Sequence, residues 1–503
     1  MDLTRRAASS TVASLFVAIA RTRPARLAIV DGARRVTYGE LALRVRRVAG
    51  MLAAAGVARG DRIALASENR AEVLEVLLAA AQLGAIAACQ NWRLAPPERA
   101  RCVELVAPRV TIASPRHAMP AGAGVGAGAA IIFGDDYEHR LAAAPEPPDV
   151  ELDPEDVLVI LYTSGTTGLP KGAAISHRAQ IVRNLVTRAE FGVAQHDAFV
   201  AWSPLYHMGA VDNSLGTLMA GGTVFVVDGF DAPRLAELVA TEPLGWLLLM
   251  PGMVGRFADE LERRAVVPRG VKLCGVMADL VPPAELARIT ALLRAPYANT
   301  FGSTETGCPP CSSSLIPIGV VPETLAKQPS PFCEIRLVDA GDRDVPDGTP
   351  GELAMRGPTL FSGYWGNAHA TAQDFRGGWF HMGDVFVRAA DGSLSFVDRV
   401  KYMIKTGGEN VYPAEIERVL LQDPRVIEAA VVRAPDPTWG EVPIAFVARR
   451  DGSLDAAALL ALCRAQLAGF KQPKQIRFIA ETEFPRSASG KVQRHELEAR
   501  VKP

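Results

Sequence analysis

Short apolar runs alternate with segments of helical periodicity along most of this chain. The runs that predict strands lie at residues 62–66, 157–162, 223–227, 246–250 and 271–276. Helical patterns separate several of these runs, and one of them, at residues 71–83, follows the first run. Because buried parallel strands are connected through covering helices, this alternation favours a layered α/β fold. We expect residues 1–400 to form a large domain of several subdomains with mainly parallel sheets.

The pattern changes after about residue 400. A helix is expected to begin at residues 413–417, and strands are expected at 426–432 and 443–447. Leucines and Cys463 then form the apolar stripe of a further helix. About 100 residues of this mixed pattern are enough for a separate domain. We therefore predict a small α+β domain over residues 401–503.

The composition fits an ordinary globular protein and excludes several other classes. Of 503 residues, 49% are hydrophobic and 22% are charged, which argues against a disordered chain, a collagen or a disulfide scaffold. Lys and Arg number 54 against 55 Asp and Glu, so no basic excess predicts binding to nucleic acid. The apolar stretches at residues 12–20 and 73–89 are too short or too polar to span a membrane. We expect a cytoplasmic protein without a membrane span.

Seven cysteines are scattered along the chain, and Cys308 and Cys311 form the one close pair. A C-x-x-C pair is typical of half a zinc site or of a redox site, but the other cysteines form no second pair. We favour reduced thiols in a cytosolic protein. A zinc or redox module at this pair is kept as an alternative.

The strongest local signal is a glycine- and hydroxyl-rich segment at residues 163–172, directly after an apolar run. Glycines let backbone N–H groups turn toward an anion, hydroxyls add donors, and a lysine adds positive charge, which together suit a polyphosphate. The spacing is not that of a Walker A loop, and the residues that follow are strand-like. A polar hairpin without a ligand is the alternative. The candidate phosphate-binding residues are Thr163, Ser164, Gly165, Thr166, Thr167, Gly168 and Lys171.

Four further segments carry polar residues between glycines. They read Asn-Thr-Phe-Gly-Ser-Thr-Glu-Thr-Gly at 299–307, Gly-Trp-Phe-His-Met-Gly-Asp at 378–384, Lys-Thr-Gly-Gly-Glu-Asn-Val-Tyr-Pro at 405–413 and Pro-Arg-Ser-Ala-Ser-Gly-Lys at 485–491. Together with the segment at 163–172, their order and separation resemble the adenylate-forming superfamily. That superfamily includes acyl-CoA and aryl-CoA synthetases, luciferases and peptide-synthetase adenylation domains. The resemblance covers nearly the whole chain and implies a large N-terminal AMP- and acid-binding domain with a mobile C-terminal domain.

The resemblance implies a nucleotide site with several named parts. Phe301 would stack on adenine, Thr304 would bind the α-phosphate, and Glu305 would hold magnesium, a hard cation that prefers oxygen ligands. Asp384 and Arg399 would contact the ribose, since a carboxylate can accept bonds from two hydroxyl donors. The remaining nucleotide-binding candidates in the second segment are Asn299, Thr300 and Gly302.

For the mobile domain, the resemblance assigns a hinge, a CoA contact and a catalytic lysine. Lys401 stands at the hinge, and Tyr402 replaces an acid often found beside it. Gly407 and Gly408 would line the pantetheine tunnel, where a thin chain passes close to backbone. Lys491 would neutralise charge during adenylation. Since acetylation would remove that charge, we hypothesise a lysine acetyltransferase and deacetylase as partners.

The acid-binding segment is expected at residues 204–209, with the candidate catalytic residue His207 near the acyl carboxylate. A histidine of the core or of the pocket wall is the alternative. Peptide-synthetase domains place an aspartate here to hold an amino group, so His207 argues against amino-acid substrates. Asp279 stands where relatives carry a glycine-rich element beside adenine, and it is either an adenine contact or an acid of a turn.

The resemblance predicts an AMP-forming acid–CoA ligase that uses ATP, CoA and Mg²⁺. A carboxylate would attack ATP to give an acyl-adenylate and pyrophosphate, and CoA would then take the acyl group and release AMP. The mostly uncharged candidates for the acid pocket favour an aromatic, alicyclic or medium-chain monocarboxylate. The alternatives are an enzyme of the same fold that loads a carrier protein and a non-catalytic nucleotide-binding protein.

Overall fold

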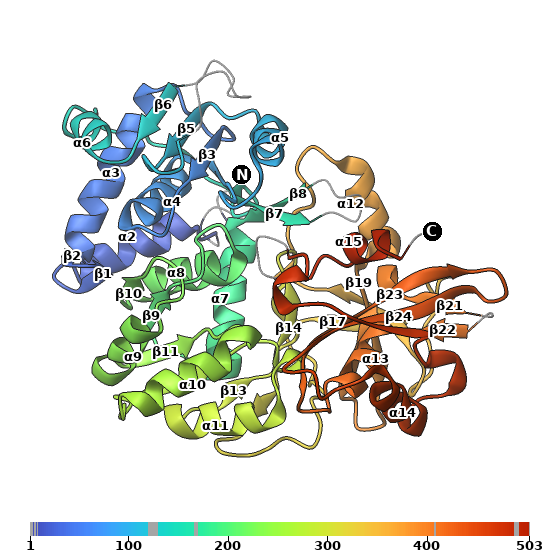
Figure 1. The fold of residues 1–503 in the computed structure, drawn as a ribbon. Coiled ribbons are helices and arrows are strands. Elements are labelled where there is room, and N and C mark those ends of the chain that lie inside the picture. Colours follow the sequence, from blue (N-terminus) through green and yellow to red (C-terminus); the bar gives the residue numbers. More distant parts are fainter. Residues whose placement is uncertain are drawn as a thin grey trace. The chain divides into compact units, whose positions relative to one another are not determined.

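The computed structural model describes residues 4, 7, 9–118, 129–164, 170–406, 409–486 and 492–501, and the chain divides into two compact units (Figure 1). The first unit contains Met1–Glu334 and Arg356–Phe375, and the second contains Ile335–Met355 and Arg376–Pro503. The second unit therefore includes residues that precede residue 401, the domain boundary expected from the sequence. That functional boundary and its hinge stay predictions.

The first unit contains an eight-stranded sheet with the order β16-β13-β12-β11-β9-β10-β1-β2. Its inner strands pair in parallel, and antiparallel strands close both edges. The strands are β1 (Leu27–Asp31), β2 (Arg34–Thr37), β9 (Ala198–Ala201), β10 (Val224–Val226), β11 (Leu244–Leu247), β12 (Val271–Cys274), β13 (Tyr297–Ala298) and β16 (Leu315–Ile316).

A second sheet of six strands has the order β6-β5-β3-β4-β7-β8. Five of its strands are parallel, and β8 pairs antiparallel with β7 at one edge. The mainly parallel sheets predicted from the alternating pattern are confirmed. The strands are β3 (Arg62–Ala66), β4 (Ile86–Cys89), β5 (Val110–Ala113), β6 (Ala129–Ile132), β7 (Val157–Ser164) and β8 (Pro170–Ser176).

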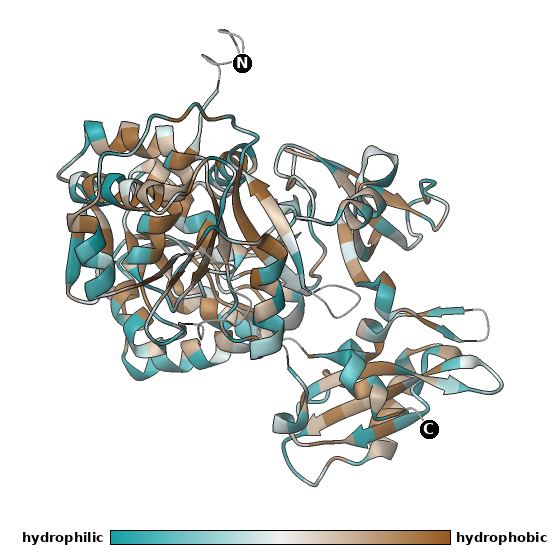
Figure 2. Ribbon diagram, turned by 90° about the horizontal axis from the view of Figure 1, so that it is seen from above, coloured by the Kyte–Doolittle hydropathy of each residue, from teal (hydrophilic) through white to brown (hydrophobic). Residues whose placement is uncertain are grey.

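Helices pack on these sheets, and apolar residues are concentrated along the strands that they cover (Figure 2). The predicted helix at residues 71–83 is α4, whose side chains are buried on nearly all sides. The helices of this unit are α2 (Val12–Thr22), α3 (Tyr38–Ala54), α4 (Ala71–Leu83), α5 (Pro96–Val106), α6 (Asp135–Ala142), α7 (His177–Phe191), α8 (Met208–Ala220), α9 (Ala232–Thr241), α10 (Val254–Arg263), α11 (Pro283–Leu293) and α12 (Ala368–Asp374), with short 3₁₀ turns η1 (Pro251–Met253) and η2 (Ala278–Leu280).

The second unit contains two smaller sheets. The first has the order β17-β18-β19-β20, with β18, β19 and β20 antiparallel, and the other has the order β22-β21-β24-β23 with β25 beside β24. The strands are β17 (Glu334–Val338), β18 (Gly351–Arg356), β19 (Phe380–Arg388), β20 (Leu394–Arg399), β21 (Ile404–Thr406), β22 (Glu409–Val411), β23 (Val426–Asp436), β24 (Gly440–Arg449) and β25 (Gln475–Phe478).

Helices cover the larger of these two sheets, and the predicted apolar stripe lies in its core. Leu459 and Cys463 on α14 are fully buried there. The remaining elements are α13 (Pro413–Leu420), α14 (Ala456–Gln466) and α15 (Arg494–Ala499), with 3₁₀ turns η3 (Arg376–Gly378), η4 (Val400–Tyr402), η5 (Gly469–Lys471) and η6 (Glu481–Glu483). Within the described ranges, no helix combines the length and the apolar character that a membrane crossing needs.

Candidate active site

The predicted phosphate-binding segment connects two antiparallel strands. β7 and β8 pair so that Thr163 lies opposite Lys171. The segment thus leads from strand to strand, as the sequence predicts, whereas a Walker A loop leads into a helix. Other predicted contacts lie outside the described residues: the side chain of Ser164, and Gly165, Thr166, Thr167 and Gly168.

Lys171 lies between a carboxylate and an aromatic ring. Its Nζ is 3.3 Å from Oδ2 of Asp374 and 4.4 Å from the ring centroid of Tyr364. Asp374 is the last residue of α12, where the helix dipole disfavours a negative charge, so the lysine compensates that charge. The side chain of Lys171 is 19% exposed, so it is not fully enclosed by the protein.

The second predicted segment forms a hairpin of β14 (Phe301–Ser303) and β15 (Gly307–Cys311). A Cβ at Gly302 would lie 2.0 Å from the carbonyl oxygen of Gly307, so only glycine fits there. Residues 304–306 make the turn, and Ser303 Oγ accepts the backbone N–H of Glu305 at 3.2 Å. Thr300 is buried before the hairpin, and Phe301 is partly exposed on β14.

Glu305 is buried and held by a tyrosine. The hydroxyl of Tyr364 donates to Oε1 of Glu305 at 3.1 Å. Burial, with the nearby carboxylates of Glu305 and Asp374, raises the pKa of Tyr364 above its ordinary value, so the hydroxyl stays a donor. Within the described residues, Oε2 of Glu305 accepts no hydrogen bond. One oxygen of the carboxylate is thus positioned by the protein, and the other can bind a ligand.

Arg183 supports the turn at residues 304–306 from the protein interior. Its guanidinium donates to the carbonyl oxygens of Thr304 at 3.1 Å and Thr359 at 2.9 Å. It also donates to Oδ2 of Asp212 on α8 at 3.2 Å. Burial raises the pKa of Asp212, while the Arg183 charge opposes that shift. This arginine therefore connects the turn with the helix that follows His207.

Asn299 is bonded to protein groups at both ends of its amide. Its Oδ1 accepts from Lys327 Nζ at 2.6 Å, and its Nδ2 donates to the carbonyl oxygens of Leu325 and Ala326. Lys327 is fully buried, and its Nζ lies 2.8 Å from Oδ2 of Asp279. Asp279 was expected to be either an adenine contact or an acid of a turn. The structure shows a further role, as the counter-ion of a buried lysine.

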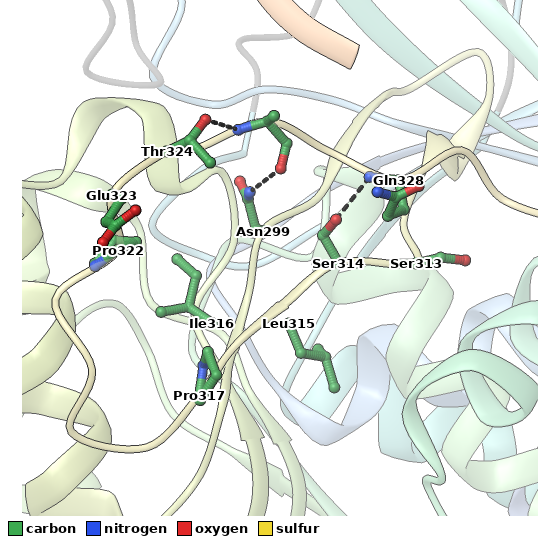
Figure 3. Close-up of a pocket in the computed structure, with 11 residues that line it drawn as sticks. Asn299, Ser313, Ser314, Leu315, Ile316, Pro317, Pro322, Glu323, Thr324 and Gln328 are labelled. Atoms are coloured by element: carbon green, nitrogen blue, oxygen red, sulfur yellow. Dashed lines mark hydrogen bonds between the residues drawn. The ribbon is translucent and has the colours of Figure 1, made fainter. Parts of the chain in front are cut away.

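A pocket of about 320 Å³ beside Asn299 is lined by residues 313–317, which include β16, and by residues 322–324, 326 and 328 (Figure 3). Ser314 Oγ accepts the backbone N–H of Gln328 at 2.6 Å, and Thr324 Oγ1 accepts that of Ala326 at 3.1 Å. These bonds fix the segment that carries Lys327. The amide of Asn299 is consequently oriented by its neighbours before any nucleotide binds.

His207 occupies the N-cap position of α8. Its ring lies 4.5 Å from the ring of Tyr206 and is partly exposed. A helix N-terminus favours a nearby negative charge, which suits a substrate carboxylate. Burial raises the pKa of Tyr206 to about 12, and its hydroxyl has no hydrogen-bond partner in the described part of the chain. Two potential donors thus lie side by side at this position.

Asp384 and Arg399 are direct partners in the second unit. They lie opposite each other on β19 and β20, with 3.1 Å between Nε of Arg399 and Oδ1 of Asp384. Asp384 is buried, and Arg399 is partly exposed. The strand register therefore brings together the two residues predicted to contact the ribose.

The predicted hinge lies in η4, directly after β20. The carbonyl oxygen of Lys401 accepts a hydrogen bond from Nη2 of Arg433 at 2.6 Å. The ring of Tyr402 lies 4.9 Å from Nζ of Lys401 and 4.8 Å from the guanidinium of Arg494, so Tyr402 contacts two cations. Gly407, Gly408 and Lys491 lie outside the described residues.

Cys308 and Cys311 are free cysteines on β15. Burial raises the pKa of the Cys308 thiol to about 12 and that of Cys311 further. Since the thiolate is the form that binds metal or attacks a disulfide, these thiols are poorly suited to either role. Across the described ranges, no three His, Cys, Asp or Glu side chains form a metal-binding group.

Comparisons with known proteins cover nearly the whole chain. Residues 16–365 match the AMP-binding enzyme family, and residues 415–491 match the AMP-binding enzyme C-terminal domain. A feruloyl-CoA synthase from Amycolatopsis sp. is 36% identical over 96% of this chain and 97% of its own. The chain belongs to the AMP-binding enzyme family.

Other relatives of this AMP-binding enzyme are also CoA ligases or CoA synthetases. An indoleacetate–CoA ligase from Aromatoleum aromaticum is 33% identical over 94% of this chain and 95% of its own. The solved o-succinylbenzoate CoA synthetase from Bacillus subtilis with its acyl-adenylate intermediate has a TM-score of 0.85 at 26% identity, covering 96% of this chain and 97% of its own. The same enzyme with ATP and a magnesium ion has a TM-score of 0.83 at 25% identity, with coverages of 96% and 98%. The predicted fold and the predicted class, an AMP-forming acid–CoA ligase, are confirmed.

Sequence analysis missed three residues that support the site of this AMP-binding enzyme. Tyr364, Arg183 and Lys327 each hold a predicted site residue or the turn that carries it. Tyr364 was signalled only by a Gly-Tyr-Trp run at 363–365, which alone is typical of a turn. Arg183 and Lys327 carry no local signal, because their partners are distant in the sequence.

Proposed function

We propose that this enzyme activates an aromatic carboxylic acid and transfers it to free CoA. The observation that carries this proposal is the similarity, over nearly the full length, to ligases named for ferulate, indoleacetate and succinylbenzoate. Each of these acids contains an aromatic ring. Sequence reasoning left alicyclic and medium-chain acids open as well, and the relatives favour the aromatic class among them.

In the proposed first half-reaction, a carboxylate oxygen of the acid bonds to the α-phosphorus of ATP and pyrophosphate leaves. The reaction brings several negative charges together, so cations must offset them. Lys171 and the neighbouring segment would bind phosphate oxygens, Thr304 would donate to the α-phosphate, and Lys491 would neutralise the charge that develops. Phe301 would stack on adenine, with Thr300 and Gly302 shaping the segment beside it.

Magnesium fits the residues present. A hard divalent cation usually binds through one or two carboxylates together with substrate phosphates. The free Oε2 of Glu305 provides such an oxygen, and Tyr364 fixes the orientation of the carboxylate. When bound, the ion would offset negative charge on the triphosphate.

The proposed second half-reaction requires a change of conformation. After rotation about Lys401, Lys491 would withdraw and the Gly407–Gly408 segment would approach the thiol of CoA. The CoA sulfur bonds to the acyl carbon and loses its proton, and the bond from that carbon to AMP breaks. Asp384 and Arg399 would hold the ribose in both half-reactions, whereas His207 with Tyr206 would orient the carboxylate of the free acid in the first.

The test is a panel of carboxylic acids incubated with ATP, Mg²⁺ and CoA. We expect substituted benzoates, cinnamates or arylacetates to support release of AMP and formation of a CoA thioester, both measured by chromatography. Aliphatic acids of similar length serve as the comparison. If aliphatic acids react as well as every aromatic one, the proposed substrate class is wrong.

Two finer proposals concern the cellular setting. We place the enzyme in the cytoplasm, where ATP and CoA are available and seven free cysteines stay reduced. Acetylation of Lys491 by a lysine acetyltransferase would remove the charge needed for adenylation, and a deacetylase would restore it. Mass spectrometry of the protein from its native cells tests whether Lys491 is acetylated.

A further inference from the structure

Tyr364 lies between the two charged residues that the proposed function assigns to the triphosphate. Its hydroxyl donates to Oε1 of Glu305 at 3.1 Å, and its ring lies 4.4 Å from Nζ of Lys171. The residue is 8% exposed, so these contacts are shielded from water. Neither the sequence motifs nor the family resemblance gave this tyrosine a role.

Backbone hydrogen bonds attach the tyrosine's segment to both motifs. The N–H of Phe361 donates to the carbonyl oxygen of Glu305 at 2.9 Å. On the other side, the N–H of Ala174 donates to Gly363 at 3.0 Å, and that of Trp365 donates to Gly172 at 2.8 Å. Residues 361–365 therefore run along β8 while touching the turn at Glu305, which fixes the position of Tyr364 between them.

The position of the ring also separates two opposite charges. A lysine and a glutamate without a spacer would pair with each other, and each would then be less available to a ligand. Here Lys171 pairs with Asp374 at 3.3 Å, while Glu305 bonds to the tyrosine hydroxyl. The ring also makes a cation–π contact with Lys171, independently of the hydroxyl.

We propose that Tyr364 is a positioning residue that aims Glu305 at the metal ion and keeps Lys171 apart from that carboxylate. The inference rests on the proposed function, since it takes Glu305 as the magnesium ligand and Lys171 as a phosphate ligand. Tyr364 itself touches neither the substrate nor the metal. Its effect reaches the reaction through the orientation of Glu305 and the availability of Lys171.

The test compares Y364F, which removes the hydroxyl alone, with Y364L, which also removes the ring. Hydrogen bonds to a charged group contribute about 1.5–3 kcal/mol, so Y364F should raise the Mg²⁺ concentration for half-maximal activity about tenfold or more. The KM for the acid should stay unchanged. Y364L should in addition raise the KM for ATP, because Lys171 loses its aromatic contact.

A matched control exists within the same unit. Tyr137 donates to Oε2 of Glu75 at 3.0 Å, so Y137F removes a buried hydroxyl from a carboxylate far along the sequence from the motifs. Y137F should lower thermal stability without changing the Mg²⁺ dependence. If Y364F behaves like Y137F in both measurements, Tyr364 is only a packing residue and the proposal is overturned.

Binding of Mn²⁺, followed by electron paramagnetic resonance with a non-hydrolysable ATP analogue, gives a readout without turnover. We expect weaker Mn²⁺ binding to Y364F than to the wild-type protein or Y137F. This measurement decides the role of Tyr364 even if no acid in the panel is a substrate, which would count against the proposed function alone. Equal Mn²⁺ binding by all three proteins would refute the positioning role.

Discussion

His177 is a fully buried residue at the start of α7. From its environment we predict how the stability of the protein depends on pH. Burial lowers its pKa to about 4, and its Nδ1 accepts the backbone N–H of Val12 at 3.3 Å. The folded state therefore resists protonation, whereas the unfolded chain takes up a proton near pH 6.5. Stability should be full above pH 6.5 and should fall by about 3 kcal/mol as the pH approaches 4.

Urea denaturation of the wild-type protein and H177Q between pH 4 and 8 checks this prediction. H177Q should remove that part of the pH dependence, because it cannot take up the proton. The exposed His139 on α6 provides the control, and H139Q should follow the wild-type curve. A curve for H177Q that parallels the wild type would contradict the assignment.

Lys491 should be needed for one half-reaction only. K491A should abolish acid-dependent exchange of pyrophosphate into ATP, because the charge that develops in the adenylation step then lacks its lysine. Thioester formation from a supplied acyl-adenylate should continue at a rate near that of the wild type. K474A, at an exposed lysine of the same unit, should leave both steps unchanged. Equal loss of both half-reactions in K491A would rule out the assigned role.

At this scale, the sequence predicts charged ligands but not the residues that hold them. Lys171 belongs to a compact motif whose residue types suit a phosphate, and the family resemblance implies the metal role of Glu305. Tyr364 and Arg183 act through contacts between segments that are far apart in the chain. Such contacts depend on the fold, so no local pattern could indicate them.

At the scale of elements, the alternating pattern predicted the mainly parallel sheets correctly, and each run predicted as a strand of the large unit overlaps a strand, although β11 (Leu244–Leu247) ends before the predicted run at 246–250 does. The helix at 71–83 formed as expected, because nearly all of its side chains are buried. Shorter elements such as β13 and β16 were not predicted. Their two-residue pairing depends on neighbouring strands rather than on periodicity.

An ion pair that involves a buried lysine connects η2 with the segment of residues 322–328. We expect this pair to contribute strongly to the free energy of unfolding. Lys327 is fully buried and has Asp279 as its counter-ion at 2.8 Å. D279N should lower the free energy of unfolding by about 3 kcal/mol, because it leaves an uncompensated buried charge. The double variant D279N/K327M should recover much of that loss, since it removes both charges.

Urea denaturation of the single and double variants measures this coupling. D228N removes the carboxylate of an exposed pair with Arg116 and should cost less than about 1 kcal/mol. It therefore controls for the chemistry of the substitution. Were D279N as stable as D228N, Lys327 would not depend on Asp279, and the network would not stabilise the fold.

At the scale of the whole molecule, local patterns predicted a large α/β part and a small α+β part. They did not predict which residues belong to each compact unit. Residues 335–355 belong to the second unit together with β19 and β20, although they lie far before residue 401. Their sheet is joined through pairing between β18 and β19. Pairing of this kind is decided by tertiary structure, so a change in sequence character could not reveal it.

The predicted rotation of the C-terminal domain gives the sharpest test at this scale. Lys401 lies in η4, and proline there would fix φ near −65° and restrict Val400 as well. K401P should therefore slow the half-reaction that needs rotation, thioester formation, by at least about tenfold. Pyrophosphate exchange, which needs no rotation once the adenylating conformation is formed, should stay within about twofold of the wild type.

K401A separates the loss of the side chain from the loss of backbone freedom, because alanine keeps φ free. It should leave both half-reactions close to the wild-type rates, although it removes the contact of Lys401 with the Tyr402 ring. Rapid-quench measurements on each half-reaction give the comparison. Equal slowing of both steps by K401P would place the pivot elsewhere, whereas selective slowing of thioester formation would locate it at η4.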